Sequence, residues 1–531
     1  MNNALYYGDN LAVLREHIKD ASVDLIYLDP PFNSNADYNV LFKAPDGHQS
    51  QAQIEAFEDT WHWNTSGAER AFDETMSSGN SNAADLLRSM RQFLGENDLM
   101  AYLAMMAVRL IELHRVLRET GSLYLHCDPT ASHYLKILLD AIFGPRQYRN
   151  ELIWQRTGAH SDAKRFGKVT DTIFFYSKSM NWKFNPQHIE YDPAYVRKRY
   201  RYVDDISGKL FWPNTMTAAG VGPPRSFRGN ALTPPNGTHW RFSQSEIDRL
   251  QVEGRIYYSK SGMPYVKSFL EERKGRAVQN LWDDIVMSKS GAERLGYPTQ
   301  KPLALLERVV AASSDEGDVV LDPFCGCGTT VHAAQKLNRR WIGIDITHLA
   351  ISLIEKRLKD AFPGVKYNVH GVPKDADGAA DLSRRDKYQF QWWAVSLVDA
   401  VPFAGKKKGA DGGIDGIVYF KPDPKTTERA IVSVKGGESV SVAMIRDLKG
   451  VLDRENAPIG IFVTLTAPTK PMVAEAAAAG FYDTGFGTFP RLQILTVKDL
   501  FAGKKPQIPF GHSEGFKKAP RERKGDQDKL L

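Results

Sequence analysis

Two short segments of the chain carry the residue types needed for chemistry on an amine. Residues 29–32 read Asp-Pro-Pro-Phe, and residues 322–330 begin with an acid and continue into a glycine-rich loop. Each follows an apolar run, at 23–28 and 319–321, which predicts a buried strand. In an open α/β sheet, ligands bind at the carboxyl ends of such strands. The glycine-rich loop suits a nucleotide-like cofactor, and the other loop suits a planar amine such as a nucleobase.

Three further motifs accompany these two loops in a fixed order. Residues 6–10 (Tyr-Tyr-Gly-Asp-Asn) precede the first loop, and residues 297–302 (Tyr-Pro-Thr-Gln-Lys-Pro) precede the second. Residues 341–345 (Trp-Ile-Gly-Ile-Asp) follow the second loop. The ordered set resembles the permuted beta class of amino-group DNA methyltransferases, which act on adenine N6 or cytosine N4. The resemblance runs over residues 4–362, with a variable stretch in the middle.

The resemblance implies a fold as well as an activity. The expected fold is α/β: a doubly wound, Rossmann-like methyltransferase sheet with an inserted irregular target-recognition region, plus a smaller α/β domain at the C-terminus. A Rossmann dehydrogenase is the rival interpretation of the glycine-rich loop. It is disfavoured because Gly328 is followed by Thr329, Thr330 and Val331, so the G-x-G-x-x-G pattern is absent.

The implied reaction transfers the methyl group of S-adenosylmethionine to a base in double-stranded DNA. An exocyclic amine is a poor nucleophile because its lone pair is delocalised into the ring. A carboxylate and a carbonyl at 29–30 can each accept one amine N–H, and two prolines remove competing N–H donors. The base has to be flipped out of the duplex to reach such a site. The expected catalytic residues are Asp29, Pro30, Pro31 and Phe32, with Phe32 offering a face for stacking.

The cofactor residues are expected around the second loop. Gly326 and Gly328 allow close backbone approach, and Asp322 can meet the positively charged methionine end. Asp345 ends the next strand, where an acid binds ribose hydroxyls in doubly wound folds. By resemblance, Asp9 contacts the adenine ring of the cofactor. The resemblance assigns the remaining cofactor contacts to Thr299, Lys301, Pro302, Phe324 and Thr329.

The identity of the base is a separate question. Asp29 favours adenine N6, because cytosine-N4 members of the family more often carry Ser at that position. Cytosine N4 is the alternative. A different class of protein, a DNA-binding protein without catalysis, is disfavoured because both loops are intact.

A second resemblance lies in the C-terminal part of the chain. Residues 409–416 (Gly-Ala-Asp-Gly-Gly-Ile-Asp-Gly) lead into a predicted strand at 417–420, and residues 430–437 form a partner strand. The pattern resembles the PD-(D/E)xK nucleases, particularly their Mrr-like branch. The resemblance implies that Asp415 binds Mg²⁺ and that Lys435 orients or activates water for phosphodiester cleavage.

This C-terminal pattern lacks acids that the nucleases usually carry. Ser433 stands two residues before Lys435 in place of an acid, and Gln391 stands where a helical Glu is common. Asp411 is a candidate replacement. Because hard cations need charged oxygen ligands, an active nuclease and a DNA-binding or structural remnant both remain open.

Alternating strand and helix patterns define the expected domains. The middle of the chain gains Pro, Gly, Trp and Tyr, and its basic residues at 197–201 are interleaved with tyrosines, which suits either DNA contact or a solvated helix face. The polar segment 50–97 is expected to be an inserted loop or lid. The expected division is a catalytic half (1–180), a target-recognition region (181–290), a cofactor half (291–370), a linker (371–386), a nuclease-like domain (387–510) and a disordered basic tail (511–531).

Composition places the chain among ordinary globular proteins. It has 531 residues, 42% of them hydrophobic and 25% charged, with a net charge of +6 that mildly favours a polyanionic partner. Three cysteines form no disulfide framework and fit a reducing cytoplasm. Cys325 and Cys327 are better explained as small loop residues than as metal ligands. The expected partner is double-stranded DNA, with no membrane contact, and a homodimer is left open.

Overall fold

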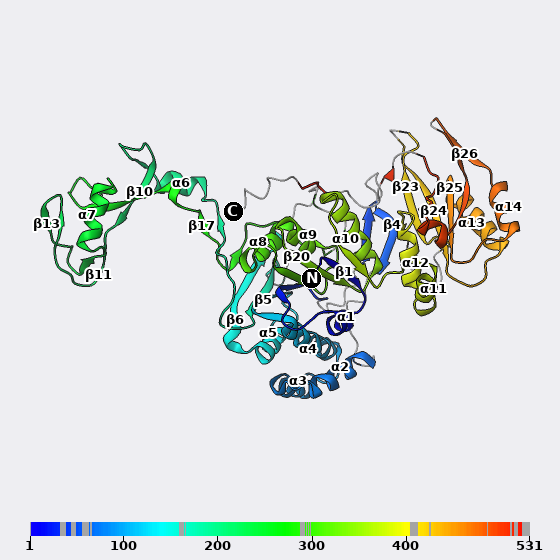
Figure 1. Cartoon of the computed structure of the whole chain (residues 1–531), viewed down its shortest axis with the longest axis horizontal. Coiled ribbons are helices and arrows are strands. Elements are labelled where there is room, and N and C mark those ends of the chain that lie inside the picture. Colours follow the sequence, from blue (N-terminus) through cyan, green and yellow to red (C-terminus); the bar gives the residue numbers. More distant parts are fainter. Residues whose placement is uncertain are drawn as a thin grey trace. The chain divides into compact units, whose positions relative to one another are not determined.

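The computed structural model describes most of the chain. Described are residues 2–31, 39–43, 49–55, 63, 66–158, 164, 166–286, 293, 295, 297, 299–403, 412–423, 426–485, 487–509, 512–513 and 519–522. The chain forms two compact units, one made of Met1–Asn185 with Asn280–Leu531 and the other of Pro186–Gln279 (Figure 1). No helix among the described residues is long and apolar enough to cross a bilayer.

A nine-stranded mixed sheet is the centre of the first unit, with the strand order β18-β6-β7-β5-β2-β19-β20-β1-β21. Parallel pairing joins β5, β2, β19, β20, β1 and β21, and β7 lies antiparallel between β5 and β6. This confirms the expected Rossmann-like α/β class. The strands are β1 (Ala4–Tyr7), β2 (Val23–Leu28), β5 (Leu117–Cys127), β6 (Tyr148–Gln155), β7 (Thr170–Ser177), β18 (Leu281–Trp282), β19 (Val319–Asp322), β20 (Arg340–Asp345) and β21 (Asn368–His370).

The neighbouring strands β2 and β19 bring the two sequence halves together. Leu25 pairs with Val320 and Ile26 with Leu321 in parallel register. Every residue of β2 is buried, including Asp24. The Asp24 carboxylate accepts the Val319 N–H at 2.9 Å, so an acid of one half caps the first strand residue of the other. Because the two strands are parallel, the loops that follow them open at the same edge of the sheet.

Helices cover this sheet and supply most of its core. Along α4, apolar residues on nearly every side are buried, which is typical of a central helix. Asn97 begins this helix, accepting the Met100 N–H with its side chain. The sequence patterns predict helices at 98–118, 133–143, 303–313 and 348–362, and the structure confirms each of them within two residues. The helices are α1 (Asn10–His17), α4 (Asp98–Val116), α5 (Ser132–Phe143), α8 (Leu303–Ser313), α9 (Thr329–Lys336) and α10 (His348–Ala361).

The expected inserted loop or lid at 50–97 is wrong for most of its length. Its described part contains the end of a hairpin, β3 (Asn39–Lys43) with β4 (Gln49–Glu55), and two helices, α2 (Ser66–Ser77) and α3 (Ser81–Leu94). Ala68, Phe72 and Leu87 from these helices are buried in the main core. Apolar residues at helical spacing among many polar ones give these two helices a buried face. The helices therefore cover the core rather than the cleft.

The second unit has its own small core and short, irregular strands. A four-stranded antiparallel sheet has the order β15-β16-β10-β9. Met216, Phe227, Trp240 and Ile247 are buried together beside it. The elements are β8 (His188–Ile189), α6 (Pro193–Arg199), β9 (Tyr202–Val203), β10 (Leu210–Thr215), β11 (Thr217–Ala219), β12 (Arg225–Phe227), β13 (Asn230–Leu232), β14 (Thr238–Trp240), α7 (Gln244–Val252), β15 (Ile256–Tyr258), β16 (Pro264–Phe269), a short 3₁₀ turn at Leu270–Glu272 and β17 (Arg276–Ala277). Another 3₁₀ turn, at Pro145–Gln147, belongs to the first unit.

The C-terminal part of the first unit is a smaller α/β domain. Its sheet has the order β22-β23-β24-β25-β28, with β29 beside β23. Apolar side chains from both faces of this sheet form two buried clusters. The elements are α11 (Ala376–Arg385), α12 (Lys387–Ser396), β22 (Val401–Pro402), β23 (Gly416–Phe420), β24 (Glu428–Lys435), α13 (Val442–Arg454), β25 (Ile459–Thr464), α14 (Lys470–Ala478), β26 (Phe481–Thr484), β27 (Gly487–Pro490), β28 (Leu492–Thr496), α15 (Val497–Phe501) and β29 (His512–Ser513).

Two expectations about the C-terminal part need correction. The stretch expected to be a linker forms α11, because Asp375 caps its N-terminus and Leu382 is buried against the domain. The tail expected to be disordered contains an ordered segment at 519–522. There Ala519 is buried and Glu522 Oε1 lies 2.9 Å from His332 Nε2 on α9. The other basic tail residues, Lys517, Lys518, Arg523 and Lys524, lie outside the described residues.

Candidate active site

The loops after β2 and β19 line one cavity of about 320 Å³, a volume typical of small-molecule sites. Of the residues expected in the site, most line this cavity. They are Asp9, Asp29, Pro30, Pro31, Thr299, Lys301, Asp322, Phe324, Gly326, Thr329 and Asp345. Pro302 and Gly328 lie outside the lining, at the starts of α8 and α9. Phe32 lies outside the described residues.

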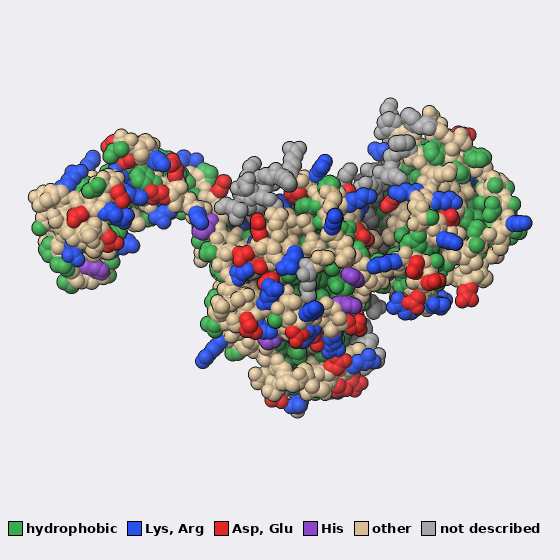
Figure 2. Space-filling model, viewed as in Figure 1, with side chains coloured by type: hydrophobic (Ala, Val, Ile, Leu, Met, Phe, Trp, Pro, Cys, Tyr) green, Lys and Arg blue, Asp and Glu red, His purple; other side chains and the backbone are tan. Residues whose placement is uncertain are grey.

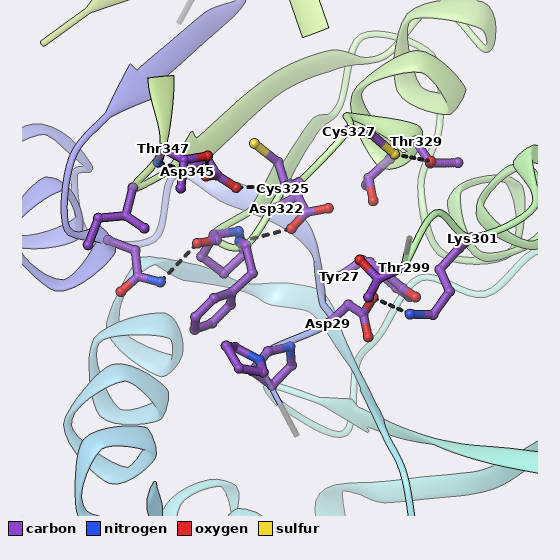
Figure 3. Close-up of a pocket in the computed structure, with 18 of the residues that line it drawn as sticks. Tyr27, Asp29, Thr299, Lys301, Asp322, Cys325, Cys327, Thr329, Asp345 and Thr347 are labelled. Carbon is purple, nitrogen blue, oxygen red and sulfur yellow. Dashed lines mark hydrogen bonds and ion pairs between the residues drawn. The ribbon is translucent and has the colours of Figure 1, made fainter. Parts of the chain in front are cut away.

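Asp29 has two oxygens in different situations. Oδ2 forms an ion pair with the Lys301 ammonium, which comes from the segment before α8 (Figure 3). Oδ1 is buried and has no hydrogen-bond partner among the described residues. A buried acceptor without a donor costs about 1–3 kcal/mol. The site therefore offers one carboxylate oxygen to a donor from a ligand.

Three carboxylates, Asp29, Asp322 and Asp345, line the same cavity. Burial, together with the negative charges of Asp29 and Asp345, raises the pKa of Asp322 to about 7. Burial likewise raises the pKa of Asp345 to about 6. Such a cavity favours a cationic ligand, because a positive charge inside it offsets the repulsion among the acids. A ligand with a sulfonium and an ammonium group fits this set of carboxylates.

The C-terminal end of β20 is hydrogen-bonded to the glycine-rich loop. Asp345 Oδ2 accepts the Gly326 N–H at 2.9 Å, while Oδ1 accepts the N–H and the hydroxyl of Thr347 at 2.9 and 2.8 Å. Gly326 has φ +48°, in the left-handed region that favours glycine. Asp345 therefore holds the loop backbone in addition to facing the cavity.

Gly328 serves packing rather than ligand approach. Its φ is +73°, and an added Cβ would lie 2.7 Å from Cγ1 of Ile354 on α10. The expectation that Gly328 permits close approach to the cofactor is therefore better stated as close approach to α10. Of the two loop glycines, Gly326 is the one that lines the cavity.

Asp9 is held by the protein on both sides of its carboxylate. Oδ1 caps α1 by accepting the Ala12 N–H at 3.1 Å, and Oδ2 accepts from Arg109 Nη2 at 2.7 Å. The buried Arg109 also donates to Asn10 Oδ1 at 2.7 Å, and Asn10 donates to the Pro323 carbonyl at 2.9 Å. The role of Asp9 as a contact of the cofactor adenine stays a prediction.

Sequence reasoning missed Arg109, Asn10 and a group beneath Asp29. The buried Arg109 is a cation in the apolar middle of α4, which is a usable signal. Tyr27 lies two residues before Asp29 on the same face of β2 and lines the cavity. Its hydroxyl lies 2.8 Å from His126 Nδ1 on β5. Strand pairing, which the sequence does not state, brings Tyr27 and His126 together.

The C-terminal domain brings its expected residues together as well. Asp415 precedes β23 and Lys435 ends the neighbouring β24. The Asp415 carboxylate is buried and engaged on both oxygens: Oδ1 accepts from the Gln391 amide of α12, and Oδ2 accepts the Val434 N–H at 2.6 Å. Ser433 is buried in β24.

These groups do not make up a magnesium site. Within the described ranges, no three His, Cys, Asp or Glu side chains converge where a metal ion could bind. Asp411, the candidate replacement acid, lies outside the described residues. The described ligands therefore do not fit a divalent cation, because the one central carboxylate is already hydrogen-bonded on both oxygens.

The fold and site define a class of α/β enzyme that binds a cationic nucleotide-like cofactor beside an acid loop. Comparison with known proteins specifies the family. Residues 23–356 match the N6/N4 DNA methylase family model, and residues 382–482 match the Mrr catalytic model, described as restriction endonuclease. The chain belongs to the DNA methylase family and carries an Mrr-like C-terminal domain. Its methyl donor is S-adenosylmethionine.

Individual relatives share a low sequence identity with the chain but align with it over most of its length. The type II methyltransferase M.EcaI of Enterobacter cloacae is 28% identical over 67% of this chain and 69% of its own length. The type III restriction-modification enzyme StyLTI Mod subunit of Salmonella typhimurium is 27% identical over 64% of this chain and 50% of its own length. The DNA adenine methyltransferase YhdJ of Escherichia coli is 23% identical over 72% of this chain and 91% of its own length.

Proposed function

We propose that the protein is a site-specific adenine-N6 DNA methyltransferase acting on a flipped adenine in double-stranded DNA. The observation that carries the proposal is the buried Asp29 Oδ1, which has no hydrogen-bond partner among the described residues, beside Oδ2 paired with Lys301. An exocyclic amine supplies the N–H donor that this oxygen lacks. The name of the relative YhdJ and the acid at position 29 support adenine over cytosine.

The protein groups around Asp29 have separable tasks in this proposal. When bound, S-adenosylmethionine supplies a methyl group activated by a sulfonium. Asp29 Oδ1 and the Pro30 carbonyl each accept one amine N–H, which returns electron density to the nitrogen. Asp29 would also accept the proton that the amine nitrogen releases once it has gained the methyl group. Lys301 orients Asp29 and keeps Oδ1 directed at the amine.

The other cofactor assignments remain proposals supported by position. Asp322 and Asp345 supply negative charge along the cavity, where the methionine end and the ribose need acceptors. Thr299, from the segment before α8, and Phe324 and Thr329, from the glycine-rich loop, also line it. Holding two substrates in one cavity in near-attack geometry supplies much of the rate.

DNA contact by the second unit is supported by its surface chemistry. Arg197, Lys198 and Arg199 are exposed on α6, and the Arg199 guanidinium lies 3.6 Å from the Trp212 ring centroid. Arg228 stacks in the same way on Tyr258, at 3.9 Å. Figure 2 shows Lys and Arg side chains spread over the visible face of this unit rather than gathered in one patch. Such exposed cations suit phosphates along a duplex.

The test of the proposed function is the chemical identity of the product. Purified protein is incubated with mixed-sequence DNA and S-adenosylmethionine labelled on its methyl group, and the DNA is digested to nucleosides. Labelled N6-methyladenine is the expected product. Labelled N4-methylcytosine would overturn the choice of base, and no labelled nucleoside would overturn the activity.

A combined restriction-modification enzyme is the second candidate, favoured by the Mrr-like match at residues 382–482. It requires Mg²⁺-dependent cutting of DNA that Lys435→Ala abolishes while methylation survives. A cytoplasmic location and a homodimer remain predictions. The mass of the purified chain in solution tests the second of these.

A further inference from the structure

The floor of the methyltransferase cavity holds a buried row of polar groups that the chemistry above does not use. The Tyr27 hydroxyl lies 2.8 Å from His126 Nδ1, and His126 Nε2 lies 3.2 Å from Asp171 Oδ2. Arg156 Nε lies 3.3 Å from the other Asp171 oxygen. Tyr27, His126 and Asp171 are 2%, 0% and 3% exposed, respectively. The row therefore crosses three neighbouring strands, β2, β5 and β7, beneath the reaction centre.

The proton positions in this row follow from the chemistry of its end group. Burial alone would raise the pKa of Asp171, but the His126 hydrogen bond and the charges of Arg156 and Lys301 lower it below its ordinary value. An ionised carboxylate only accepts, so His126 Nε2 carries the proton that it donates to Asp171. We assign His126 the neutral tautomer with its proton on Nε2, in which Nδ1 accepts. Tyr27 accordingly donates its one hydroxyl proton to His126 Nδ1.

The hydroxyl oxygen of Tyr27 is thereby left as an acceptor. Burial, followed by the charges of Asp29, Asp322 and Asp171, raises the pKa of Tyr27 well above its ordinary value, so the phenol stays protonated at neutral pH. Both Asp29 of the base loop and Asp322 of the cofactor loop act on this phenol. Tyr27, Asp29 and Asp322 line the same cavity, so the phenol lies in the region where the methyl donor and the amine have to meet.

Simple packing does not require such a row. The buried tyrosines Tyr124 and Tyr176 of the same sheet have simpler surroundings: the Tyr124 hydroxyl lies 2.7 Å from Ser313 Oγ, and the Tyr176 hydroxyl lies 2.7 Å from Asp140 Oδ1 and 3.4 Å from the Lys136 carbonyl. Burying a histidine, a carboxylate and one end of an ion pair costs free energy. Such buried polar groups can serve to fix one arrangement of their hydrogen bonds. The Tyr27 row specifies the direction of one O–H bond.

We propose that Tyr27 is a catalytic residue, an inference that rests on the proposed methyl transfer. Its hydroxyl oxygen accepts weak hydrogen bonds from the polarised C–H groups of the sulfonium methyl. His126 and Asp171 are positioning residues that keep the Tyr27 proton turned away from the cavity. The contact holds the methyl group in line with the amine. A hydroxyl proton pointing the other way would face a positively charged methyl and repel it.

The test compares two ligands that differ by the methyl group. Calorimetry without DNA measures the affinities of S-adenosylmethionine and S-adenosylhomocysteine for wild type and Tyr27→Phe. In Tyr27→Phe, we expect the affinity for S-adenosylmethionine relative to that for S-adenosylhomocysteine to fall about threefold. This is the size of effect expected from the loss of a weak C–H···O contact. S-Adenosylhomocysteine should bind both proteins equally. The single-turnover methylation rate should fall about tenfold.

Two further variants separate the proposed role from a structural one. Tyr124→Phe removes a buried hydroxyl outside the cavity and should leave the ratio unchanged. Asp171→Asn retains Tyr27 but lets the amide donate to His126, which turns Nδ1 into a donor and the Tyr27 proton toward the cavity. We expect the ratio to fall at least as far as in Tyr27→Phe, so Asp171→Asn also decides the question if Tyr27→Phe does not fold.

The outcomes are distinct from those that test the proposed function. Equal losses for both ligands, or an unchanged ratio in folded Tyr27→Phe and Asp171→Asn, would overturn the inference. A product other than N6-methyladenine would overturn the choice of base without touching a ratio measured in the absence of DNA. A lowered ratio with no methylated product would support the Tyr27 contact and overturn the activity.

Discussion

The two acids at the centres of the methyltransferase and nuclease-like sites differ in what surrounds them. Asp29 has one oxygen paired with Lys301 and one buried oxygen with no partner among the described residues. Asp415 is engaged on both oxygens, by Gln391 and by the Val434 N–H. Both acids follow or precede a buried strand of an α/β sheet. The difference suggests that the first acid is prepared for a ligand, while the second is used to hold its own domain together.

Removing the charge of Asp29 should have the largest effect. Asp29→Asn keeps the shape of the side chain but loses the charge and the proton acceptor, so methyl transfer should fall about a thousandfold, as when a charge-stabilising group is removed from an active site. A methyl-transfer assay measures this, with Asp20→Asn on the surface as the control. Affinity for S-adenosylmethionine should fall far less than the methyl-transfer rate. A variant that keeps a tenth of the wild-type rate would contradict the assigned role.

Removing the cation beside Asp29 should have the next largest effect. Lys301→Met leaves the Asp29 carboxylate without its partner on Oδ2, so the carboxylate loses its fixed orientation. Because hydrogen bonds to charged groups contribute about 1.5–3 kcal/mol, the rate should fall about thirtyfold. Lys301→Arg, assayed in parallel, should recover part of it. Equal rates in Lys301→Met and wild type would show that Asp29 is oriented by other groups.

The shifted pKa of Asp322 predicts a pH dependence of cofactor binding. With a pKa of about 7, this carboxyl is neutral below that pH and negative above it. Affinity for the cationic S-adenosylmethionine should therefore rise about tenfold from about pH 6 to about pH 8. Asp322→Asn should remove this rise and hold the affinity near the low-pH value. Calorimetry over this range checks it, and an affinity that falls with pH would contradict the sign.

The nuclease-like site can be made to resemble a metal site by one substitution. Wild-type protein should bind Mg²⁺ only weakly, because Asp415 is already occupied. Gln391→Glu replaces its amide partner by a second carboxylate and should tighten Mg²⁺ binding about fivefold, since hard cations prefer charged oxygens. Calorimetric titration measures both proteins. Tight Mg²⁺ binding by the wild type would show that residues outside the described ranges complete the site.

Much of the methyltransferase site could be predicted because its residues stand in short motifs after apolar strands. Asp29, Asp322 and Gly326 needed only the motif and the rule that ligands bind at strand ends. Arg109 and His126 were missed because their partners come from other elements, α1 in one case and β2 with β7 in the other. The helices α2 and α3 were missed because a polar composition masked a helical spacing of a few apolar residues.

In the C-terminal domain, sequence motifs predict the positions of residues but not all of their contacts. Asp415 and Lys435 were placed on neighbouring strands as the pattern indicates, yet the hydrogen bond from Gln391 depends on how α12 packs, which no motif describes. The same holds for the segment at 519–522, whose contact with His332 joins parts of the chain far apart in sequence. Local patterns predict elements, and tertiary packing decides which polar groups are satisfied.

The central claim is that Asp29 Oδ1 accepts the exocyclic amine of the target adenine. A double-mutant cycle tests it most directly, with wild type and Asp29→Asn each bound to duplexes carrying adenine or purine, which lacks the amine, at the mapped target position. We predict a coupling free energy of about 1.5–3 kcal/mol, the value of a hydrogen bond to a charged group. A coupling free energy near zero would show that the amine does not contact Asp29 and would contradict the account.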